Sequence, residues 1–598
     1  MKRIYIVVAA LFLLVSNDAT AQKRKASYRG ESLGLTKKPN IIFILADDLG
    51  IGNVSCYGAD HYSTPNIDKL AKEGIRFNHM FTAPLCGPSR ALIMTGRYAF
   101  RTGATNQDAT TLMKQENEKM IPQILTPAGY VTTCVGKWGQ LPLGPGEFGF
   151  DDYLRFKGSG VYKNSPEKIN HYTVNGEDKV MTDAEYMPDL MHDHLIDFLS
   201  KNKNKPFFAY YPMSHVHGTI VSTPDSKPDS KDLYADNVAY MDKLVGELLT
   251  VLDSLKLREN TLIFFMGDNG TASQWYANST INGKILSGKK GEMKECGGLV
   301  PMIANWPGKV PSGVVSEQLI DASDILPTLA ELTGAKLPSG IIDGKSFAYN
   351  LFGKKSQDRD WIFCELGNKW YVRNQGWKLN NNNELFDMSN APFEEILITD
   401  QNKSAASEEG YKKLKAVLDE LAPQNGILDT GDGSGRHGNK KERSCYFARK
   451  SAWGVSTSKL CAMQATRILA IRHGETAWNV DTRIQGQLDI GLNDTGLWQA
   501  QRLGWALREE DIHTVYSSDL GRAYQTAQAI AHAPTRSTPL PLKPTAALRE
   551  RHFGHFQGQT WDDITSKWPA DAQRALQAIV GLKPRAQPDG QAIAQAPG

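Results

Sequence analysis

The sequence predicts an α/β fold in which a mixed, mostly parallel sheet is sandwiched between helices. Three continuously apolar runs, residues 40–46, 205–211 and 261–266, are typical of strands that are buried on both faces. Helical segments such as residues 234–256 alternate with them, as expected where helices connect parallel strands. Ligands bind such sheets at the carboxyl ends of the strands, so the polar residues that follow these runs predict a site there.

The length of 598 residues exceeds what one hydrophobic core ordinarily supports, so we expect two or more domains. Hydrophobic residues make up 41% of the chain and charged residues 22%, which is typical of a globular protein. The formal net charge of +3 is small for this length and argues against a nucleic-acid-binding protein. Seven cysteines without a C-x-x-C pair predict neither a disulfide framework nor a zinc site.

The first 21 residues have the features of a secretory signal peptide. Lys2 and Arg3 give the positive region, residues 4–15 the apolar region, and residues 19–21 a cleavage site with small side chains. About a dozen apolar residues are too few for a spanning helix, and an uncleaved anchor is the alternative. We therefore expect an exported protein, periplasmic or secreted, without stable membrane insertion.

The composition of the chain changes near residue 450. Lysine outnumbers arginine 39 to 14 up to this point, whereas 4 lysines and 11 arginines follow it. Since both residues supply the same charge, the inversion indicates segments of different ancestry that join after the glycine-rich stretch 431–441. The expected parts are a signal peptide at 1–21, a catalytic domain at 37–335, a subdomain at 336–440, a linker at 441–466 and a further domain at 467–598.

The subdomain is expected to be a small α+β structure. Residues 361–364, 369–372 and 376–379 alternate like antiparallel strands, and residues 408–421 have a helical pattern. Its aromatic residues are interpreted as core, with a sugar-binding platform as the alternative.

The most informative motif is C-G-P-S-R at residues 86–90, followed by T-G-R at residues 95–97. Pro88 suits the first turn of a helix, where its missing N–H costs nothing. Cys86 then lies at the positive end of the helix beside Arg90, where an anion is stabilised. For this motif taken alone, the alternative is a buried cysteine before an ordinary helix.

Further motifs follow in a fixed order along the first part of the chain. The pair Asp47-Asp48 follows the first apolar run, and G-D-N-G at residues 267–270 follows the third. Either pair alone, D-D or D-N, is more typical of turn and cap residues. G-K-W at residues 136–138 and a lysine before a G-G-x-V-P segment complete the order. In this order the motifs resemble the type I sulfatases over about residues 37–440.

The resemblance implies the alkaline-phosphatase-like fold of the sulfatases together with their chemistry. In that family the cysteine that matches Cys86 is oxidised to formylglycine by a cytosolic formylglycine-generating enzyme before export, and the hydrated aldehyde attacks sulfur. The implied substrate is a sulfate ester, in the first place a sulfated carbohydrate. Motifs at residues 211–213 and 223–226 resemble one bacterial branch of the family, so we expect a bacterial protein.

By the same resemblance a divalent cation is bound next to residue 86. The implied ligands are three carboxylates, one amide and the modified residue itself: Asp47, Asp48, Asp268, Asn269 and Cys86. Hard oxygen donors of this kind suit Ca²⁺, with Mg²⁺ as a substitute, far better than zinc.

The resemblance also implies a ring of cations around the sulfate. Arg90, Lys137 and Lys290 would neutralise its charge and keep doing so as charge builds up on the oxygens. His217 or Lys290 would protonate the leaving oxygen. His215 is the second choice for the histidine.

One position departs from the family pattern. Most relatives carry a histidine two residues after the lysine of G-K-W, where this chain has Gly139. In them that histidine helps to break down the reaction intermediate, and Gln140 cannot act as a base in its place. A protein that retains sulfated glycans without cleaving them therefore stays open as an alternative. A phosphonate or phosphodiester hydrolase of the same superfamily is a second alternative, because the resemblance implies that this chemistry occurs on the same fold with the same modified cysteine.

Residues 467–598 resemble a different family, the histidine phosphatases, which include the phosphoglycerate mutases. Residues 467–471 predict a strand, and R-H-G-E at residues 472–475 ends it. The family's further motifs follow in order. The implied site consists of a histidine that is phosphorylated, two arginines that hold phosphate and an acidic proton donor: His473, Arg472, Arg522 and Glu550.

This second resemblance is incomplete. The family needs a second histidine late in the domain, and no histidine follows His555. The last strand and helices of the fold are missing as well. We therefore expect an incomplete α/β domain of the histidine-phosphatase type that is catalytically inactive.

Overall fold

The computed structural model describes residues 4–9, 33, 35–113, 116–139, 143–166, 168–354, 358–431, 467–507, 512–533, 538–550, 552–569 and 571. They fall into two compact units: the large unit, residues 29–454, and the small unit, which combines residues 1–28 with residues 455–598. The expected cleavage site at residues 19–21, Gln140 and the expected linker 441–466 lie outside the described residues.

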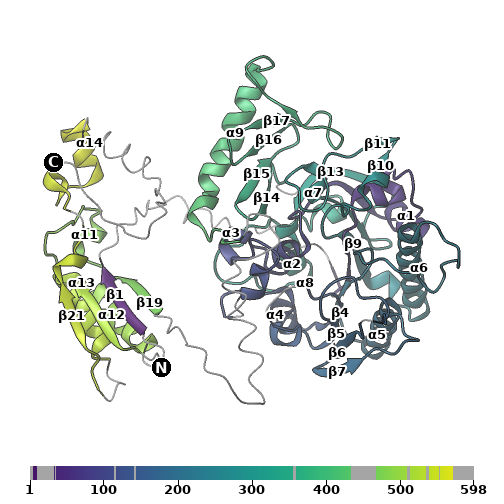
Figure 1. The fold of residues 1–598 in the computed structure, drawn as a ribbon, viewed down its shortest axis with the longest axis horizontal. Coiled ribbons are helices and arrows are strands. Elements are labelled where there is room, and N and C mark those ends of the chain that lie inside the picture. Colours follow the sequence, from purple (N-terminus) through teal and green to yellow (C-terminus); the bar gives the residue numbers. More distant parts are fainter. Residues whose placement is uncertain are drawn as a thin grey trace. The chain divides into compact units, whose positions relative to one another are not determined.

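A ten-stranded mixed sheet forms the centre of the large unit (Figure 1), in the order β13-β3-β12-β9-β2-β8-β4-β5-β6-β7. Its strands are β2 Asn40–Ala46, β3 Ile75–Phe81, β4 Val131–Gly136, β5 Asp152–Phe156, β6 His171–Val174, β7 Glu177–Val180, β8 Phe207–Pro212, β9 Thr261–Gly267, β12 Leu299–Asn305 and β13 Val314–Asp321. Neighbours from β9 to β5 pair in parallel, whereas β12 is antiparallel to both β9 and β3. The expected mixed, mostly parallel sheet is confirmed.

Helices cover both faces of this sheet (Figure 1). In β2 the odd-numbered residues 41–45 belong to one core cluster and the even-numbered residues 42–46 to the other. The first cluster includes residues of α2 Cys86–Thr95, α4 Ile121–Leu125 and α8 Ile325–Thr333, and the second includes residues of α1 Pro65–Lys72, α5 Met187–Asn202 and α6 Leu233–Ser254. Because both faces are covered, the strand is apolar at every position instead of every second one.

The expected subdomain is an antiparallel sheet with one long helix against it. The sheet contains β14 Ile362–Leu366, β15 Lys369–Arg373, β16 Trp377–Asn380, β17 Leu385–Asp387 and β18 Ile396–Leu397, and the helix is α9 Ala405–Leu421. Val372 and Leu414 belong to the same core cluster as the odd-numbered residues of β2, so the subdomain and one face of the large sheet share a core. Trp370 and Trp377 pack against that core, which supports the interpretation of these aromatic residues as core.

The small unit contains a four-stranded parallel sheet in the order β19-β1-β20-β21. Its strands are β19 Arg467–Arg472, β1 Ile4–Ala9, β20 Thr514–Ser518 and β21 Leu542–Thr545, and its helices are α11 Ala477–Val480, α12 Asp494–Ala506, α13 Gly521–Ala531 and α14 Trp561–Lys567. The core of the unit lies between this sheet and α13.

The position of β1 differs from the expectation that residues 1–21 are only a removable signal peptide. Residues 4–9 pair in register with β19 on one side and with β20 on the other. An apolar run with β-branched residues fits a central parallel strand as well as the apolar region of a signal peptide. Cleavage before Gln22 would take this strand out of the sheet. The signal peptide therefore stays a prediction.

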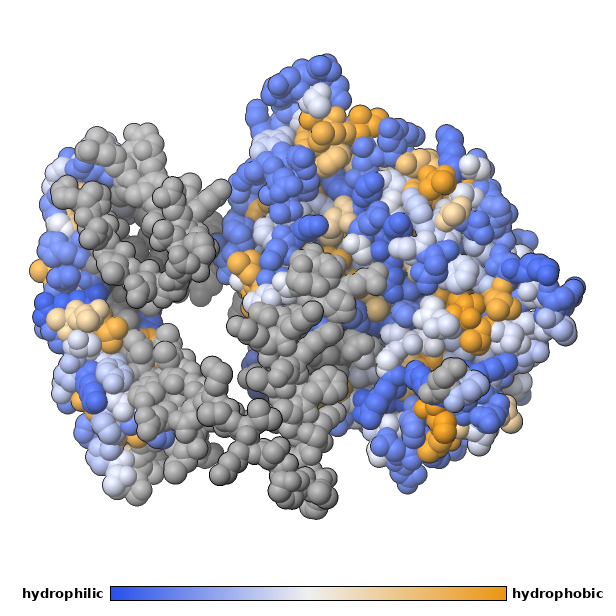
Figure 2. Space-filling view, viewed as in Figure 1, coloured by the Kyte–Doolittle hydropathy of each residue, from blue (hydrophilic) through white to orange (hydrophobic). Residues whose placement is uncertain are grey.

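The surface of the large unit is mainly hydrophilic, with separate apolar patches (Figure 2). Ile285 and Ile341 are among its exposed large apolar residues, at 55% and 57% exposure. Within the described ranges, no helix is both long and apolar enough to cross a bilayer.

Lys137 owes its position to the glycine that ends β4. Gly136 has a φ of +130°, and a Cβ at this position would lie 2.2 Å from the Pro212 carbonyl oxygen of β8. The Lys137 N–H donates to the same carbonyl at 2.9 Å. Glycine alone allows this close approach of two backbones, and Lys137 is thereby placed at the carboxyl edge of the sheet.

We expect Gly136→Ala to destabilise the large unit strongly. Gly158→Ala is the matched control, because Gly158 also has a positive φ, +89°, but its Cβ would meet nothing within 4 Å. The control variant loses only about 1 kcal/mol in the free energy of unfolding, the cost of the left-handed backbone conformation. Gly136→Ala adds the overlap with Pro212, about 1–3 kcal/mol more. Urea unfolding measures both, and equal unfolding midpoints would contradict this account.

Candidate functional site

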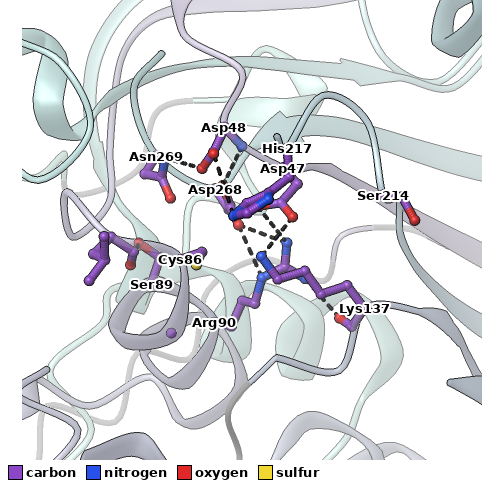
Figure 3. Close-up of polar contacts among 12 residues, drawn as sticks. Asp47, Asp48, Cys86, Ser89, Arg90, Lys137, Ser214, His217, Asp268 and Asn269 are labelled. Atoms are coloured by element: carbon purple, nitrogen blue, oxygen red, sulfur yellow. Dashed lines mark hydrogen bonds and ion pairs between the residues drawn. The ribbon is translucent and has the colours of Figure 1, made fainter. Parts of the chain in front are cut away.

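Side chains from five segments converge at the carboxyl edge of the central strands (Figure 3). Asp47 and Asp48 follow β2, Asp268 and Asn269 follow β9, and Lys137 follows β4. The remaining labelled members are Cys86, Ser89 and Arg90 of α2 and His217 after β8, whereas Ser214 lies apart from the group. Because β9, β2, β8 and β4 are parallel neighbours, their ends meet at one edge of the sheet.

Cys86 is the first residue of α2 and is buried, at 4% exposure. The Ser89 hydroxyl fixes the start of the helix by donating to the carbonyl oxygens of Ala83 at 2.7 Å and Leu85 at 3.0 Å. Burial raises the pKa of the Cys86 thiol, although the ammonium groups of Lys137 and Lys290 act against it. An unmodified thiol here is therefore protonated and a weak nucleophile.

Arg90 joins α2 to the end of β9. Its Nε and Nη2 donate to Asp268 Oδ2 at 3.0 and 2.7 Å, and its Nη1 donates to the Lys137 carbonyl oxygen at 2.8 Å. The same Nη2 lies 3.7 Å from Asp47 Oδ1. Burial alone would lower the pKa of Arg90, but the carboxylates of Asp268 and Asp47 raise it, so the guanidinium stays charged.

Lys137 and Lys290 each pair with one of the two adjacent aspartates. Lys137 Nζ donates to Asp47 Oδ2 at 2.6 Å, and both side chains are fully buried. Burial opposes the charge of this pair, but Lys137 lowers the pKa of Asp47 and Asp47 raises that of Lys137. Lys290 Nζ lies 2.7 Å from both carboxylate oxygens of Asp48, whereas Lys289 pairs with Glu292 at a partly exposed position.

Asp48 is held in its position by the end of β9. Its backbone N–H donates to Asp268 Oδ1 at 3.0 Å, and Asn269 Nδ2 donates to Asp48 Oδ1 at 2.9 Å. The residue has a φ of +61°, a left-handed conformation that aspartate tolerates better than most residues. This conformation turns the carboxylate toward Lys290.

The two histidines after β8 have different surroundings. His217 Nδ1 contacts the Gly218 carbonyl oxygen, and its Nε2 lies 3.8 Å from Asp48 Oδ2 at the partly exposed rim of the site. His215 is fully buried and lies 3.2 Å, Nε2 to hydroxyl, from Tyr186. Burial lowers the pKa of His215 to about 3, so it is a neutral packing residue. The structure brings His217, the first choice of the sequence analysis, to the site.

The oxygen donors fit a divalent cation. Asp47 Oδ1 and Asn269 Oδ1 are buried and accept no hydrogen bond, which is costly for a carboxylate and an amide. Ligand atoms of Asp47, Cys86 and Asp268 lie within 4.8 Å of one another, as do those of Asp47, Asp48 and His217. Oxygen donors of this type suit Ca²⁺ or Mg²⁺.

Gly139 and Gln107 are the two features that the motifs did not explain. Gly139 has a φ of +86°, and a Cβ there would lie 3.1 Å from Arg90 Cδ, so a larger side chain would crowd the arginine. Gln107 Oε1 lies 3.4 Å from Cys86 Sγ. Sequence reasoning missed Gln107 because it belongs to no motif and only the fold brings it next to α2.

The small unit assembles a second cluster around Arg522. Its Nε lies 3.2 Å from His473 Nε2, and its Nη2 donates to Glu550 Oε2 at 3.0 Å. Burial and then the positive charges of Arg522 and Arg472 lower the pKa of His473 to about 4, whereas burial raises the pKa of Glu550. The Arg472 side chain is exposed. Three of the four residues expected here are thus in contact, and the fourth is close enough to affect the histidine.

Comparison with known proteins identifies both units. The sequence profile described as Sulfatase matches residues 39–335. N-acetylgalactosamine-6-sulfatase of Canis lupus familiaris is 33% identical over 361 residues, which cover 54% of this chain and 68% of that protein. The chain belongs to the sulfatase family, and the large unit is a sulfuric ester hydrolase. Residues 468–595 match the profile of the histidine phosphatase superfamily (branch 1).

Other similar proteins agree with this assignment. Arylsulfatase A of Homo sapiens is 31% identical over 373 residues, which cover 55% of this sulfatase and 71% of that protein. The crystal structure of Ps i-CgsB in complex with k-i-k-neocarrahexaose has a TM-score of 0.58 and 28% identity, and the match covers 70% of this chain and 98% of that one. PsFucS1 sulfatase from Pseudoalteromonas sp. has a TM-score of 0.54 and 25% identity, with coverages of 65% and 91%.

We expect His215 to make the stability of this sulfatase depend on pH. It stays neutral in the folded protein down to its pKa of about 3, whereas in the unfolded chain it takes up a proton near the ordinary histidine pKa of 6.5. Its contribution to the free energy of unfolding is therefore fully present above pH 6.5. It is lost as the pH falls toward 3, by about 1.4 kcal/mol per pH unit. Urea unfolding between pH 6.5 and 4.5 gives the slope of the unfolding free energy against pH, which reports the protons taken up on unfolding. His215→Phe should reduce this number by one. An unchanged slope would show that His215 is not buried neutral.

Proposed function

We propose that the large unit hydrolyses sulfate esters of sulfated carbohydrates, with a formylglycine made from Cys86 and a bound Ca²⁺ ion, for which Mg²⁺ is the substitute. One observation carries the proposal: Cys86 starts a helix at the point where three buried or nearly buried cations and an oxygen donor set converge. The cations are Arg90, Lys137 and Lys290. A sulfate ester is an anion that repels nucleophiles, so its hydrolysis needs cations of this kind to neutralise the charge before attack.

The donor set next to Cys86 would hold the cation. Its members would be Asp47, Asp48, Asp268, Asn269 and residue 86. When bound, the ion supplies positive charge that polarises the sulfate and favours the ionised nucleophile. The two buried oxygens that accept no hydrogen bond, Asp47 Oδ1 and Asn269 Oδ1, support this assignment.

Arg90, Lys137 and Lys290 would bind the sulfate oxygens. Each is already anchored by one carboxylate, from Asp268, Asp47 or Asp48, at 2.6–2.7 Å. They therefore need little reorganisation as negative charge builds up in the transition state, and such preorganised charge is a large term in catalysis. The hydrated aldehyde at residue 86 supplies the hydroxyl nucleophile, which the protonated thiol could not provide.

His217 is the first candidate for the general acid, and Lys290 is the second. The side chain of His217 is 21% exposed, against 10% for Lys290, so it lies nearer the side from which an alcohol leaves. The contact of Nδ1 with the Gly218 carbonyl oxygen leaves Nε2 to face the site, 3.8 Å from Asp48 Oδ2. An imidazolium in this position can donate its proton to the leaving oxygen.

Sulfated glycans are the proposed substrate class. Similar proteins at 32–33% identity are named N-acetylgalactosamine-6-sulfatases, and a similar structure contains a neocarrahexaose. Neither a phosphonate or phosphodiester hydrolase nor a non-cleaving glycan binder is favoured.

We further propose that the protein is exported, to the periplasm or outside a bacterial cell, after a cytosolic formylglycine-generating enzyme has acted on Cys86. The charged, apolar and small residues of positions 1–21 support export. The small unit is also predicted to release no phosphate. A comparison of phosphate release by the wild type and by a His473→Ala variant tests this prediction.

The proposed function predicts an aldehyde at residue 86 and sulfate release from sulfated glycans. Peptide mass spectrometry of protein from a host with the maturation enzyme should show the mass of formylglycine in the peptide that contains residue 86. The same preparation should release sulfate from sulfated oligosaccharides faster than it cleaves aryl phosphonates or phosphodiesters. An unmodified thiol would favour the binding protein, and preferred phosphonate turnover would favour the other hydrolase class.

The general-acid assignment predicts that His217→Gln acts selectively. A poor leaving group such as a sugar alcohol needs protonation, and general-acid catalysis contributes about 10²–10⁴-fold. We therefore expect a loss of that order in kcat on a sulfated sugar, but a small loss on nitrophenyl sulfate, whose leaving group needs no proton. Equal losses on both substrates would assign the acid to Lys290 or another group.

A further inference from the structure

Gln107 contacts the reactive residue although it belongs to no motif. Its Oε1 lies 3.4 Å from Cys86 Sγ and accepts a hydrogen bond from the Gly87 N–H at 3.0 Å. Gly87 leaves the room for this contact, because a Cβ there would lie 2.8 Å from the same oxygen. The amide oxygen is therefore aimed at the first residue of α2, where the backbone N–H groups of a helix have no partner within the helix.

The turn that carries Gln107 is held by several hydrogen bonds. The Thr110 hydroxyl donates to the Gln107 carbonyl oxygen at 2.8 Å. On the other side, the Thr105 hydroxyl donates to Asp429 Oδ1 at 3.0 Å, and Asn106 Nδ2 donates to the same oxygen. These hydrogen bonds hold the turn in place, so Gln107 has a fixed position and is not a freely rotating surface residue.

Position 139 offers residue 86 no comparable hydrogen-bond partner. Gly139 has no side chain, and a Cβ there would approach Arg90 Cδ to 3.1 Å. Within the described ranges, the hydrogen bond to Gln107 is the one that the Cys86 side chain donates. The acceptor that orients residue 86 thus comes from a different part of the chain.

We propose that Gln107 is a positioning residue that accepts a hydrogen bond from the hydrated aldehyde at residue 86, an inference that rests on the proposed function. In the unmodified chain the Cys86 thiol donates to Gln107 Oε1. After conversion, a hydroxyl on the same Cβ takes the place of the thiol as the donor. The amide oxygen accepts this hydrogen bond but takes up no proton. It fixes the direction of one hydroxyl and leaves the other to face Arg90 and Lys137.

Gln107 in this role also affects the ratio of hydrate to free aldehyde at residue 86, independently of turnover. The hydrate has a hydroxyl hydrogen to donate, whereas the free aldehyde has none, so an acceptor at Gln107 stabilises the hydrate over the aldehyde. Loss of one neutral hydrogen bond changes such a ratio by roughly three- to tenfold. Removing the acceptor therefore raises the fraction of free aldehyde in the resting protein.

The test measures free aldehyde in the full-length, converted protein through its rate of oxime formation with an aminooxy reagent. Gln107→Met keeps the length of the side chain without the acceptor and should raise the rate roughly three- to tenfold, with a lower kcat on a sulfate ester. Gln107→Asn keeps the amide but is one methylene too short and should behave like the Met variant. Gln107→Glu keeps the acceptor, so the oxime rate should stay near that of the wild type, while its negative charge raises KM.

Gln123→Met is the matched control. Gln123 is also half-buried, and its Oε1 accepts a hydrogen bond from a backbone N–H, that of Met120 at 2.9 Å, but it belongs to α4 and makes no contact with Cys86. This variant should leave the oxime rate and kcat unchanged. Wild-type oxime rates in both Gln107→Met and Gln107→Asn would overturn the role of Gln107 alone. An unmodified thiol in the wild-type peptide would instead overturn the proposed function and this inference with it.

Discussion

The buried ion pair between Arg90 and Asp268 is the interaction on which the rest of the site depends. It joins the first turn of α2, where Cys86 lies, to the end of β9, and both side chains are at most 1% exposed. Burying two charges is costly and is repaid only when the geometry is good and the remaining donors are satisfied. Here two guanidinium nitrogens bind one carboxylate oxygen, and a third binds the Lys137 carbonyl oxygen. Removal of either partner would leave an uncompensated buried charge.

The site extends this arrangement to three cations and three carboxylates. Arg90 pairs with Asp268, Lys137 with Asp47, and Lys290 with Asp48, each at 2.6–2.7 Å. The carboxylates thus do two things in the proposed function, because they fix the cations that face the sulfate and also offer oxygens to a metal ion. These carboxylates directly follow β2 and β9, so the central sheet holds them in position for both roles.

Much of the fold and the site was predictable because buried parallel strands have a plain signature. The strands expected at residues 40–46 and 261–266 are β2 and β9 almost to the residue, and the pairs Asp47-Asp48 and Asp268-Asn269 follow them directly. Helix α9 begins at Ala405, earlier than expected, because Ser404 caps it by accepting a hydrogen bond from the Ser407 N–H at 3.2 Å. Other features of the site depend on contacts in three dimensions and could not be predicted from the spacing of motifs. Burial among tyrosines separates His215 from His217, and Gln107 reaches Cys86 only through the fold. The strand β1 was interpreted only as a signal peptide because its apolar pattern is the same in both roles.

The central claim is that the oxygen donors beside residue 86 bind a divalent cation, and calorimetric titration of chelator-treated protein with Ca²⁺ tests it most directly. We expect one ion per chain, a rise in the thermal unfolding midpoint at saturating Ca²⁺ through preferential binding to the folded state, and at least about tenfold weaker binding after Asn269→Leu, which removes one donor. Absence of both a binding heat and a shift in the unfolding midpoint at millimolar Ca²⁺ or Mg²⁺ would contradict the account.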